Sequence, residues 1–336
     1  MEKKEPTRQQ LESLTIKTLY ESNVKRLQLK IINSEYDLSR TIRDGELHRP
    51  GLALSGFTDV FTYWRVQILG RTEISYLLKL SPKERLQRLR SILGFDIPCL
   101  IVTNNFKPPS ELLQVADEMK IPVFNSALTT TWCVHRLGEY MDFKFAPFAY
   151  VLGSLVDVWG IGSLIIGRSG IGKSEVALDL VERGHRLVAD DVVIVRQHSA
   201  GILMGRAKKL LSNYMEIRGV GLLDIRRLYG IHSIRAQKRI EVVIQLEDWK
   251  KGENYDRTGL EERNHQILDT KVPLVRLPIY PGKNITVIVE TIALNMILRV
   301  FGENPAQELN QKLIKQMNAD EKNKKLREDL LIGDYE

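Results

Sequence analysis

The chain has 336 residues, of which 43% are hydrophobic and 27% are charged, as in an ordinary soluble globular protein. This length allows two domains with sizeable cores, so disulfides are not needed for stability. The net charge of +7 comes from basic residues spread along the chain, without zinc-finger spacing or a lysine tract. We therefore predict no nucleic-acid binding and expect the positive charge to serve small polyanions such as ATP.

No apolar run approaches the ~20 residues that span a bilayer. The first residues, MEKKEPTRQQ, are not followed by the apolar segment of a secretory signal. We therefore expect a cytoplasmic protein without membrane insertion. The two cysteines, Cys99 and Cys133, lack metal-ligand spacing, and we expect both to be reduced thiols.

Short apolar strands alternate with helical stretches in the first part of the chain, which predicts an α/β domain over residues 1–135. The expected strands are residues 66–69, 99–102 and 122–124, and the expected helices are residues 110–119 and 129–140. Two prolines mark the start of the first helix, and the second leads out of the domain. We find no catalytic group of residues here and assign this domain no role.

Frequent glycines and β-rich runs begin near residue 151 and predict a second α/β domain over residues 136–304. Its expected strands are residues 151–158, 163–166, 242–246 and 285–289, followed by an apolar helix over residues 290–300. Residues 305–336 are strongly charged, with Leu and Ile at helical intervals, and predict a helical tail. The pattern leaves open whether this helix packs on another surface or is solvated.

The most specific motif fits the phosphate-binding pattern G-x-x-x-x-G-K-[ST] at every fixed position. An expected strand over residues 164–166 precedes it and an expected helix over residues 174–183 follows it, which is the context that such a loop requires. The predicted nucleotide-binding residues are Gly167, Arg168, Ser169, Gly170, Ile171, Gly172, Lys173 and Ser174.

Each residue type in this loop has a physical reason. Gly170 and Gly172 allow successive backbone N–H groups to point at phosphate oxygens, and the helix N-terminus adds the positive end of its dipole. Lys173 would neutralise the β- and γ-phosphates, and the hydroxyl of Ser174 would bind Mg²⁺. We therefore predict ATP and Mg²⁺ as the ligands of this loop.

Two adjacent carboxylates, Asp190 and Asp191, end a short apolar strand after the loop helix. A strand in this place can return beside the strand of the loop, which would bring its end close to the phosphates. One carboxylate would then hold Mg²⁺ and the other accept the proton of an attacking hydroxyl. The alternative is a turn with two solvated aspartates. His185, just before this strand, fits a surface or packing role better than that of a base.

Two further segments contribute less specific candidates. Residues 215–221 combine an acid, a base and two glycines that suggest a mobile segment, and Glu216 is a candidate metal ligand. Arg257 lies in a polar loop and is a candidate for stabilising a transferring phosphoryl group, although a single loop arginine is more often simply solvated.

Taken together, these segments resemble the bacterial HPr kinase/phosphorylase family over most of the chain. Residues 49–52, 56–57 and 67–73 carry the resemblance in the first domain. In the second domain it is carried by GRSGIGKSE, RGHRLVADD, MEIRGVG, YDRTGL and PGKN followed by VIVE. A generic phosphate-binding loop would not reproduce these blocks in this order.

The resemblance implies an enzyme that phosphorylates a serine of HPr, a small phosphocarrier protein of sugar transport, using Mg²⁺ and ATP, or often pyrophosphate, as donor. It also implies phosphorolysis, in which inorganic phosphate attacks phosphoserine-HPr and releases pyrophosphate. It further implies a homohexamer, a catalytic domain related to phosphoenolpyruvate carboxykinase and a first domain like one in cell-wall precursor ligases.

The resemblance also implies roles by position. Lys173 binds the donor phosphates, and the Asp190–Asp191 pair supplies the carboxylate that takes the serine proton. Of the two we favour Asp190 as the base and Asp191 as the residue that assists the metal ion. Glu216 corresponds to a metal-binding glutamate, and Arg257 corresponds to a catalytic arginine.

Three positions depart from the family pattern. Leu152 stands where the family carries a histidine, and leucine neither binds a proton nor hydrogen-bonds a phosphate. Tyr280 and Lys283 replace arginines of a loop associated with phosphorolysis, and loss of an arginine from a dianion site costs a factor of ~10² or more. That loop here is Pro278, Ile279, Tyr280, Pro281, Gly282, Lys283 and Asn284. We therefore expect the kinase direction to survive better than phosphorolysis.

Three other functions fit parts of the sequence. Another P-loop NTPase is disfavoured because no N-K-x-D motif is present and the acidic pair follows the loop too closely. An inactive protein that senses a nucleotide or phosphate would explain Leu152 and Tyr280, but Lys173, Ser174 and the acidic pair argue against it. A small-molecule kinase would use the basic stretch of residues 226–239 for an anionic metabolite.

Overall fold

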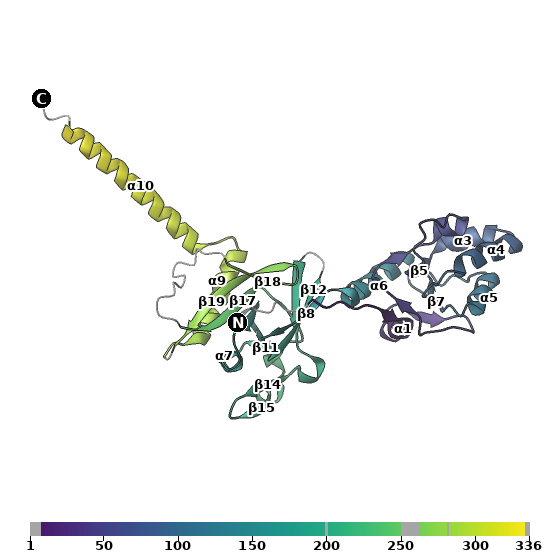
Figure 1. The fold of residues 1–336 in the computed structure, drawn as a ribbon, viewed down its shortest axis with the longest axis horizontal. Coiled ribbons are helices and arrows are strands. Elements are labelled where there is room, and N and C mark those ends of the chain that lie inside the picture. The colour runs from purple at the N-terminus through teal and green to yellow at the C-terminus, as the bar shows by residue number, and fades with distance from the viewer. Residues whose placement is uncertain (1–7, 199–200, 250–262, 281, 333–336) are drawn as a thin grey trace. The chain divides into compact units, whose positions relative to one another are not determined.

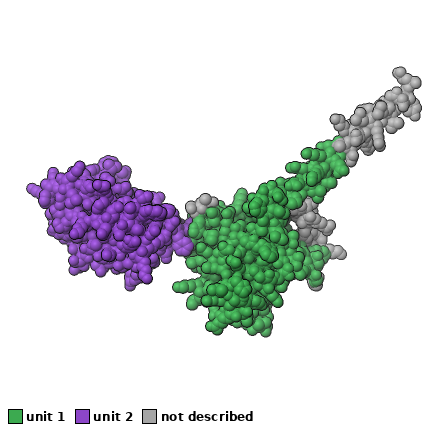
Figure 2. All heavy atoms as spheres, turned by 180° about the vertical axis from the view of Figure 1, so that it is seen from behind, with its two compact units in different colours: residues 1–8, 148–336 green, residues 9–147 purple. Residues whose placement is uncertain are grey.

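The computed structural model describes residues 8–198, 201–249, 263–280 and 282–332. They form two compact units, one of residues 9–147 and one of the described residues from 148 onward together with Arg8 (Figures 1 and 2). The predicted boundary at residues 135–136 falls inside helix α6 (Thr130–Phe145), which belongs to the first unit. Each unit has its own buried apolar clusters.

The first unit is built on a five-stranded sheet in the order β2-β7-β6-β5-β4. Strands β4 to β7 run parallel, and β2 pairs antiparallel with β7. The predicted strands are confirmed as β5 (Val66–Leu69), β6 (Leu100–Val102) and β7 (Val123–Ser126), and the first predicted helix as α5 (Ser110–Glu118). All residues of these three strands are buried, as expected where helices cover a parallel sheet. The other elements are β1 (Leu14–Thr15), α1 (Ile16–Asn23), β2 (Leu29–Ile31), β3 (Thr41–Ile42), β4 (Leu47–His48), α2 (Gly51–Ser55), α3 (Arg71–Lys79) and α4 (Pro82–Leu93).

The second unit is built on a six-stranded sheet in the order β11-β9-β10-β17-β19-β18, and the α/β class is confirmed in both units. Strands β10, β17 and β19 run parallel, and β9 and β18 run antiparallel to their neighbours. A four-stranded sheet, β16-β13-β12-β8, and the hairpin β14-β15 complete the β-structure that the described residues contain. The bounds are β8 (Phe148–Leu152), β9 (Ser154–Val158), β10 (Ile161–Ile166), α7 (Lys173–Glu182), β11 (Arg186–Ala189), β12 (Val192–His198), β13 (Ile202–Arg206), η2 (Lys209–Leu211), β14 (Tyr214–Ile217), β15 (Gly221–Asp224), α8 (Ile225–Tyr229), η3 (Ile231–Ser233), β16 (Lys238–Arg239), β17 (Val242–Asp248), β18 (Asn264–Ile267), β19 (Thr270–Ile279), α9 (Ile285–Val300) and α10 (Pro305–Ile332).

The predicted β-rich run over residues 151–158 is two strands that belong to different sheets. The chain changes sheet at Gly153, between β8 and β9. A Cβ atom at this position would lie 2.4 Å from the carbonyl oxygen of Ile165, so the close approach of the two backbones requires glycine. The crossing brings the end of β8 next to the end of the loop strand β10.

The prediction of a strand over residues 285–289 is wrong, because these residues form the first turn and a half of helix α9. The side chain of Asn284 caps the helix by accepting the backbone N–H of Val287 at 3.2 Å. Ile285 and Val289, four residues apart, are both buried on one side of the helix. Packing of this side and the cap outweigh the β-propensity of the Ile-Thr-Val-Ile-Val run.

The predicted tail helix is present as α10 (yellow in Figure 1). Its apolar side chains Leu309, Leu313, Ile314 and Met317 are exposed. Among the described helices, none is by itself long and apolar enough to cross a membrane; only α9 with the first half of α10, a pair bent by 72°, meets the length and composition criteria jointly.

Candidate active site

Four chain segments meet at the carboxyl edge of the six-stranded sheet. The phosphate-binding loop follows β10, and the ends of β17 and β19 lie at the same edge because these three strands are parallel. Strand β11 also points this way, since it and β10 are both antiparallel to β9. The expectation that the strand of the acidic pair lies beside the loop strand needs correction: β9 separates them. The acidic pair nevertheless ends at the loop's edge, where open α/β sheets bind their ligands.

The phosphate-binding loop has the backbone that its sequence predicts. Gly170 and Gly172 adopt φ values of +76° and +102°, a region that side chains other than glycine rarely enter. The predicted loop helix is confirmed as α7, whose first residue is Lys173. The Lys173 ammonium donates to the carbonyl oxygens of Gly167 at 3.3 Å and Arg168 at 3.1 Å, so it lies folded over the loop.

Arg168 connects the loop to the end of β17. Its guanidinium donates to both carboxylate oxygens of Asp248, at 2.7 and 2.9 Å. The hydrogen bonds with Asp248 raise the pKa of Arg168, and both side chains are about 60% exposed. An exposed pair of this kind adds little stability, but its two parallel hydrogen bonds orient the outer part of the loop.

Asp190 is the buried carboxylate of the site. Its Oδ1 accepts a hydrogen bond from the hydroxyl of Ser154 at 2.5 Å. Its Oδ2 is buried and has no hydrogen bond of good geometry among the described residues, although the Ser174 hydroxyl of the loop lies close enough to stabilise the charged form. Burial raises the pKa of this carboxyl, and the hydroxyls of Ser154 and Ser174 oppose part of that shift. The structure therefore brings Asp190 and the loop together.

Asp191 differs from its neighbour because it is exposed and has a φ of +63°. Its carbonyl oxygen accepts the backbone N–H of Gly153 at 3.0 Å. Leu152, one of the three departures noted in the sequence analysis, pairs with Val192 on β12 and is 69% exposed. An exposed side chain at position 152 thus stands beside the acidic pair.

The donors present fit Mg²⁺ bound with a phosphate ligand. The described residues contain no group of three or more His, Cys, Asp or Glu side chains able to hold a metal ion by themselves. Mg²⁺ commonly takes one or two protein oxygens and completes its shell with phosphate oxygens and water. The Ser174 hydroxyl supplies one such oxygen at the loop, beside the buried Asp190 carboxylate.

Glu216 lies on β14, exposed, between the buried side chains of Met215 and Ile217. Arg218 directly follows β14, in the turn that leads to β15. A Cβ atom at Gly170 would lie 2.7 Å from Nη1 of Arg218, so this guanidinium reaches the phosphate-binding loop. The sequence analysis assigned no role to Arg218; its only signal was an arginine beside a glycine in the block that contains Glu216.

The predicted phosphorolysis loop follows β19 at the same edge. The one lysine of this loop, Lys283, contacts other residues of the loop. Its ammonium lies 5.2 Å from the ring centroid of Tyr280 and donates to the carbonyl of Pro278 at 3.1 Å. Burial lowers the pKa of Lys283. Asn284 caps α9, Gly282 has a φ of +86°, and Pro281 and Arg257 lie outside the described residues.

His185 has a packing role, in agreement with the sequence analysis. It is buried, its Nε2 lies 2.9 Å from Glu290 on α9, and its ring meets Trp159 edge-on at 4.9 Å. Arg183 donates to the same carboxylate at 2.7 and 2.9 Å. Both contacts fix α9 against the end of the loop helix α7.

Comparison with known proteins assigns this arrangement to a family. Residues 14–141 match the family model "HPr Serine kinase N terminus", and residues 143–313 match "HPr Serine kinase C-terminal domain". An HPr kinase/phosphorylase of Chloroherpeton thalassium is 45% identical over 317 residues, which cover 94% of this chain and 93% of that protein. The chain belongs to the HPr kinase/phosphorylase family.

Other members of the HPr kinase/phosphorylase family show similar agreement. The protein of Prosthecochloris aestuarii is 42% identical over 93% of both chains, and that of Chlorobaculum tepidum is 42% identical over 92% of this chain and 91% of its own. The solved HPr(Ser) kinase/phosphatase of Coxiella burnetii is 32% identical, with a TM-score of 0.43 over 46% of this chain and 93% of its own. The predictions of this family and of an enzyme are confirmed.

Proposed function

We propose that this member of the HPr kinase/phosphorylase family transfers the terminal phosphoryl group of ATP to a serine hydroxyl of HPr, with Mg²⁺ bound at Ser174. The observation that carries the proposal is the environment of Asp190, a buried carboxylate beside the loop. Its Oδ1 accepts a hydrogen bond from Ser154, and its Oδ2 has no hydrogen bond of good geometry among the described residues. Burial raises its pKa, which makes it a stronger base than an exposed aspartate. This chemistry suits the acceptance of a proton from an incoming hydroxyl.

The other residues of the site serve the phosphates. Lys173 would leave the carbonyls of Gly167 and Arg168 and bind the transferring phosphate, while the loop N–H groups hold the remaining phosphates. Arg218, which reaches Gly170, would stabilise charge on the transferring group, as would Arg257 by its place in the family motif. Asp191 and Glu216 are the further proposed metal ligands. Mg²⁺, when bound, neutralises the charge that develops on the phosphate oxygens.

A transfer assay tests this function directly. The full chain is incubated with purified HPr and radiolabelled ATP, with Mg²⁺ or with EDTA, and the labelled site is mapped. We expect label on one serine of HPr only when Mg²⁺ is present, with pyrophosphate tested as a second donor. Rapid ATP hydrolysis with no transfer to HPr would instead favour another P-loop NTPase.

Arg218 supplies a prediction that separates a catalytic contact from a structural one. Arg218→Met should lower kcat/KM for HPr phosphorylation roughly 30-fold, because a hydrogen bond to a charged group contributes about 1.5–3 kcal/mol. The melting temperature should stay unchanged, since the side chain is exposed. Arg186→Met, an exposed arginine at the opposite end of β11, is the control and should retain full activity. Equal activity of both variants would remove Arg218 from the site.

We also propose that phosphorolysis is slower than the kinase reaction. Leu152 cannot accept a proton beside the acidic pair, and Lys283 is engaged with Tyr280 and Pro278. Incubation of phosphoserine-HPr with enzyme, Mg²⁺ and inorganic phosphate measures this reaction. Pyrophosphate release as fast as kinase turnover would contradict the proposal.

Family membership supports two proposals about the assembly and its place in the cell, a homohexamer and a cytoplasmic location. Sedimentation velocity of the full chain tests the first, and a monomer at micromolar concentration would contradict it. Fractionation of cells tests the second.

A further inference from the structure

The first unit contains a pocket with a volume of about 410 Å³, remote in sequence from every residue assigned above. Its lining comes from the segment that follows β4 and from helix α3, which follows β5. Strands β4 and β5 are parallel neighbours, so the pocket lies at the carboxyl edge of this sheet. Open α/β sheets bind ligands at that edge. The fold therefore places a cavity where this class of sheet binds ligands.

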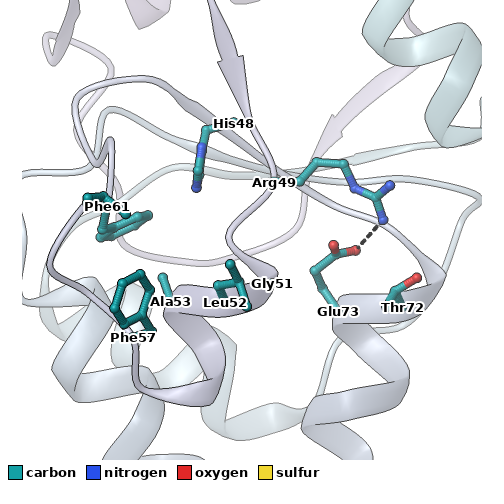
Figure 3. Close-up of a pocket in the computed structure, with 10 residues that line it drawn as sticks. His48, Arg49, Gly51, Leu52, Ala53, Phe57, Phe61, Thr72 and Glu73 are labelled. Carbon is teal, nitrogen blue, oxygen red and sulfur yellow. Dashed lines mark hydrogen bonds and ion pairs between the residues drawn. The ribbon is translucent and has the colours of Figure 1, made fainter.

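One cation of the pocket is held in a fixed orientation. Nη2 of Arg49 donates at 3.0 Å to Oε2 of Glu73, which is buried, and the same oxygen accepts the backbone N–H of Gly70 at 2.8 Å (Figure 3). The Arg49 side chain is 50% exposed, and its other N–H groups have no partner among the described residues. A guanidinium oriented by a buried carboxylate, with donors to spare, is suited to bind an oxyanion through two parallel hydrogen bonds.

The rest of the pocket is apolar. Leu52 and Val60 are about 70% exposed and Phe57 is 49% exposed, so large apolar side chains meet solvent around the cavity. Figure 3 shows His48 pointing from the end of β4 toward the helix that carries Leu52. Burial and the nearby charge of Arg65 lower the pKa of His48, which favours its neutral form. An apolar wall with one oriented cation is typical of a site for a small molecule.

The charges of the pocket limit the ligand. The lining contains one cation, Arg49, and one carboxylate, Glu73, which already uses part of the arginine's charge. A dianion such as a phosphate monoester would be repelled by the negative charge of Glu73, and Arg49 alone would have to balance the charges of both. A carboxylate monoanion matches the remaining edge of the guanidinium, and an aromatic or branched body matches Leu52 and Phe57.

We propose that this pocket of the first unit binds a small organic acid, with its carboxylate on Arg49 and its apolar body against Leu52, Phe57 and Val60. The pocket belongs to the first unit and the proposed catalytic site to the second, and the test of the pocket does not depend on kinase activity. It gives the first unit a ligand-binding role that the sequence analysis did not assign.

The test uses three probes that share a phenyl ring and differ in the charge of the polar group. Phenylacetate, phenylacetamide and phenyl phosphate are titrated into the full chain carrying labelled Leu and Val methyl groups, and the resonances of Leu52 and Val60 are followed. We expect saturable shifts with phenylacetate and at least tenfold weaker binding of the neutral amide. Tighter binding of phenyl phosphate would overturn the carboxylate assignment, and no shift with any probe would overturn the site.

Variants identify the residues that bind. Arg49→Gln should weaken phenylacetate binding at least tenfold, whereas Arg90→Gln should not. Arg90 is a matched control because it is 53% exposed, pairs with one glutamate, Glu118, and does not line the pocket. Leu52→Ala, at an exposed position, tests the apolar wall without removing the Arg49–Glu73 pair and should weaken all binding severalfold. Unchanged affinity in both Arg49→Gln and Leu52→Ala would contradict the proposal.

Discussion

Replacing Asp190 with asparagine should lower the turnover of HPr phosphorylation by roughly 10³-fold, the middle of the range for general base catalysis. Asparagine keeps the shape of the side chain and can accept the hydrogen bond from Ser154, but it cannot take the proton of the attacking serine. ATP affinity should change much less, because the loop amides and Lys173 are untouched. Radiolabelled transfer to HPr and equilibrium binding of ATP measure the two effects separately.

The neighbouring residue supplies the matched control. Asp191 is exposed, and Asp191→Asn should raise the Mg²⁺ concentration required for half-maximal activity without an equal loss of turnover at saturating Mg²⁺. If Asp191→Asn abolished turnover and Asp190→Asn did not, the two assignments would have to be exchanged. A protein that only senses nucleotide would keep its ATP affinity in both variants and show no transfer in the unmodified chain.

Replacing Asp190 with asparagine should also change how the stability of the protein depends on pH. Burial raises the pKa of Asp190 in the folded protein, so the carboxyl contributes stability below its unfolded pKa and loses that contribution as the pH rises through the folded pKa. Asparagine is neutral at every pH and avoids this loss. Asp190→Asn should therefore melt at a higher temperature than the unmodified chain at pH 8, and the difference should shrink toward pH 4. A larger difference at the acidic end would show that the carboxylate is stabilised by its surroundings instead.

Restoring the family residues at the three departing positions should increase phosphorolysis by roughly 10²-fold or more. The variant is Leu152→His with Tyr280→Arg and Lys283→Arg. The arginines would supply bidentate donors for a phosphate dianion, and the histidine would supply a titratable group beside the acidic pair. The kinase reaction should change less, since the loop and Asp190 are retained. Release of pyrophosphate from phosphoserine-HPr is the measurement.

A matched control addresses the added charge. Tyr36 is an exposed tyrosine, 41% exposed against 47% for Tyr280, and Tyr36→Arg adds one positive charge to the unit that does not contain the site. It should leave phosphorolysis unchanged. If the triple variant gained nothing over this control, the residues at positions 152, 280 and 283 would not be what limits phosphorolysis.

The phosphate-binding loop and its context could be predicted from the sequence because the chemistry depends on consecutive residues. Positive φ values at Gly170 and Gly172, a lysine at the first position of α7 and a strand before the loop are all local requirements. The buried strands of the first unit were equally clear, because a strand buried on both faces is a nearly continuous apolar run. The acidic pair was also predicted from its place after the loop helix, and the family blocks assigned roles to it.

The other features of the site and of the fold depend on residues far apart in the chain, so no local sequence pattern could predict them. Sheet order places Ser154 against Asp190 and Gly153 against Asp191, and the β14 hairpin carries Arg218 to Gly170. Burial of one face made residues 285–289 helical against their β-propensity. The pocket between β4 and α3 likewise exists only because two parallel strands end side by side. Local steric and hydrogen-bonding preferences depend on neighbouring residues, whereas burial, pKa shifts and cavities arise from the packing of residues that are far apart in the chain.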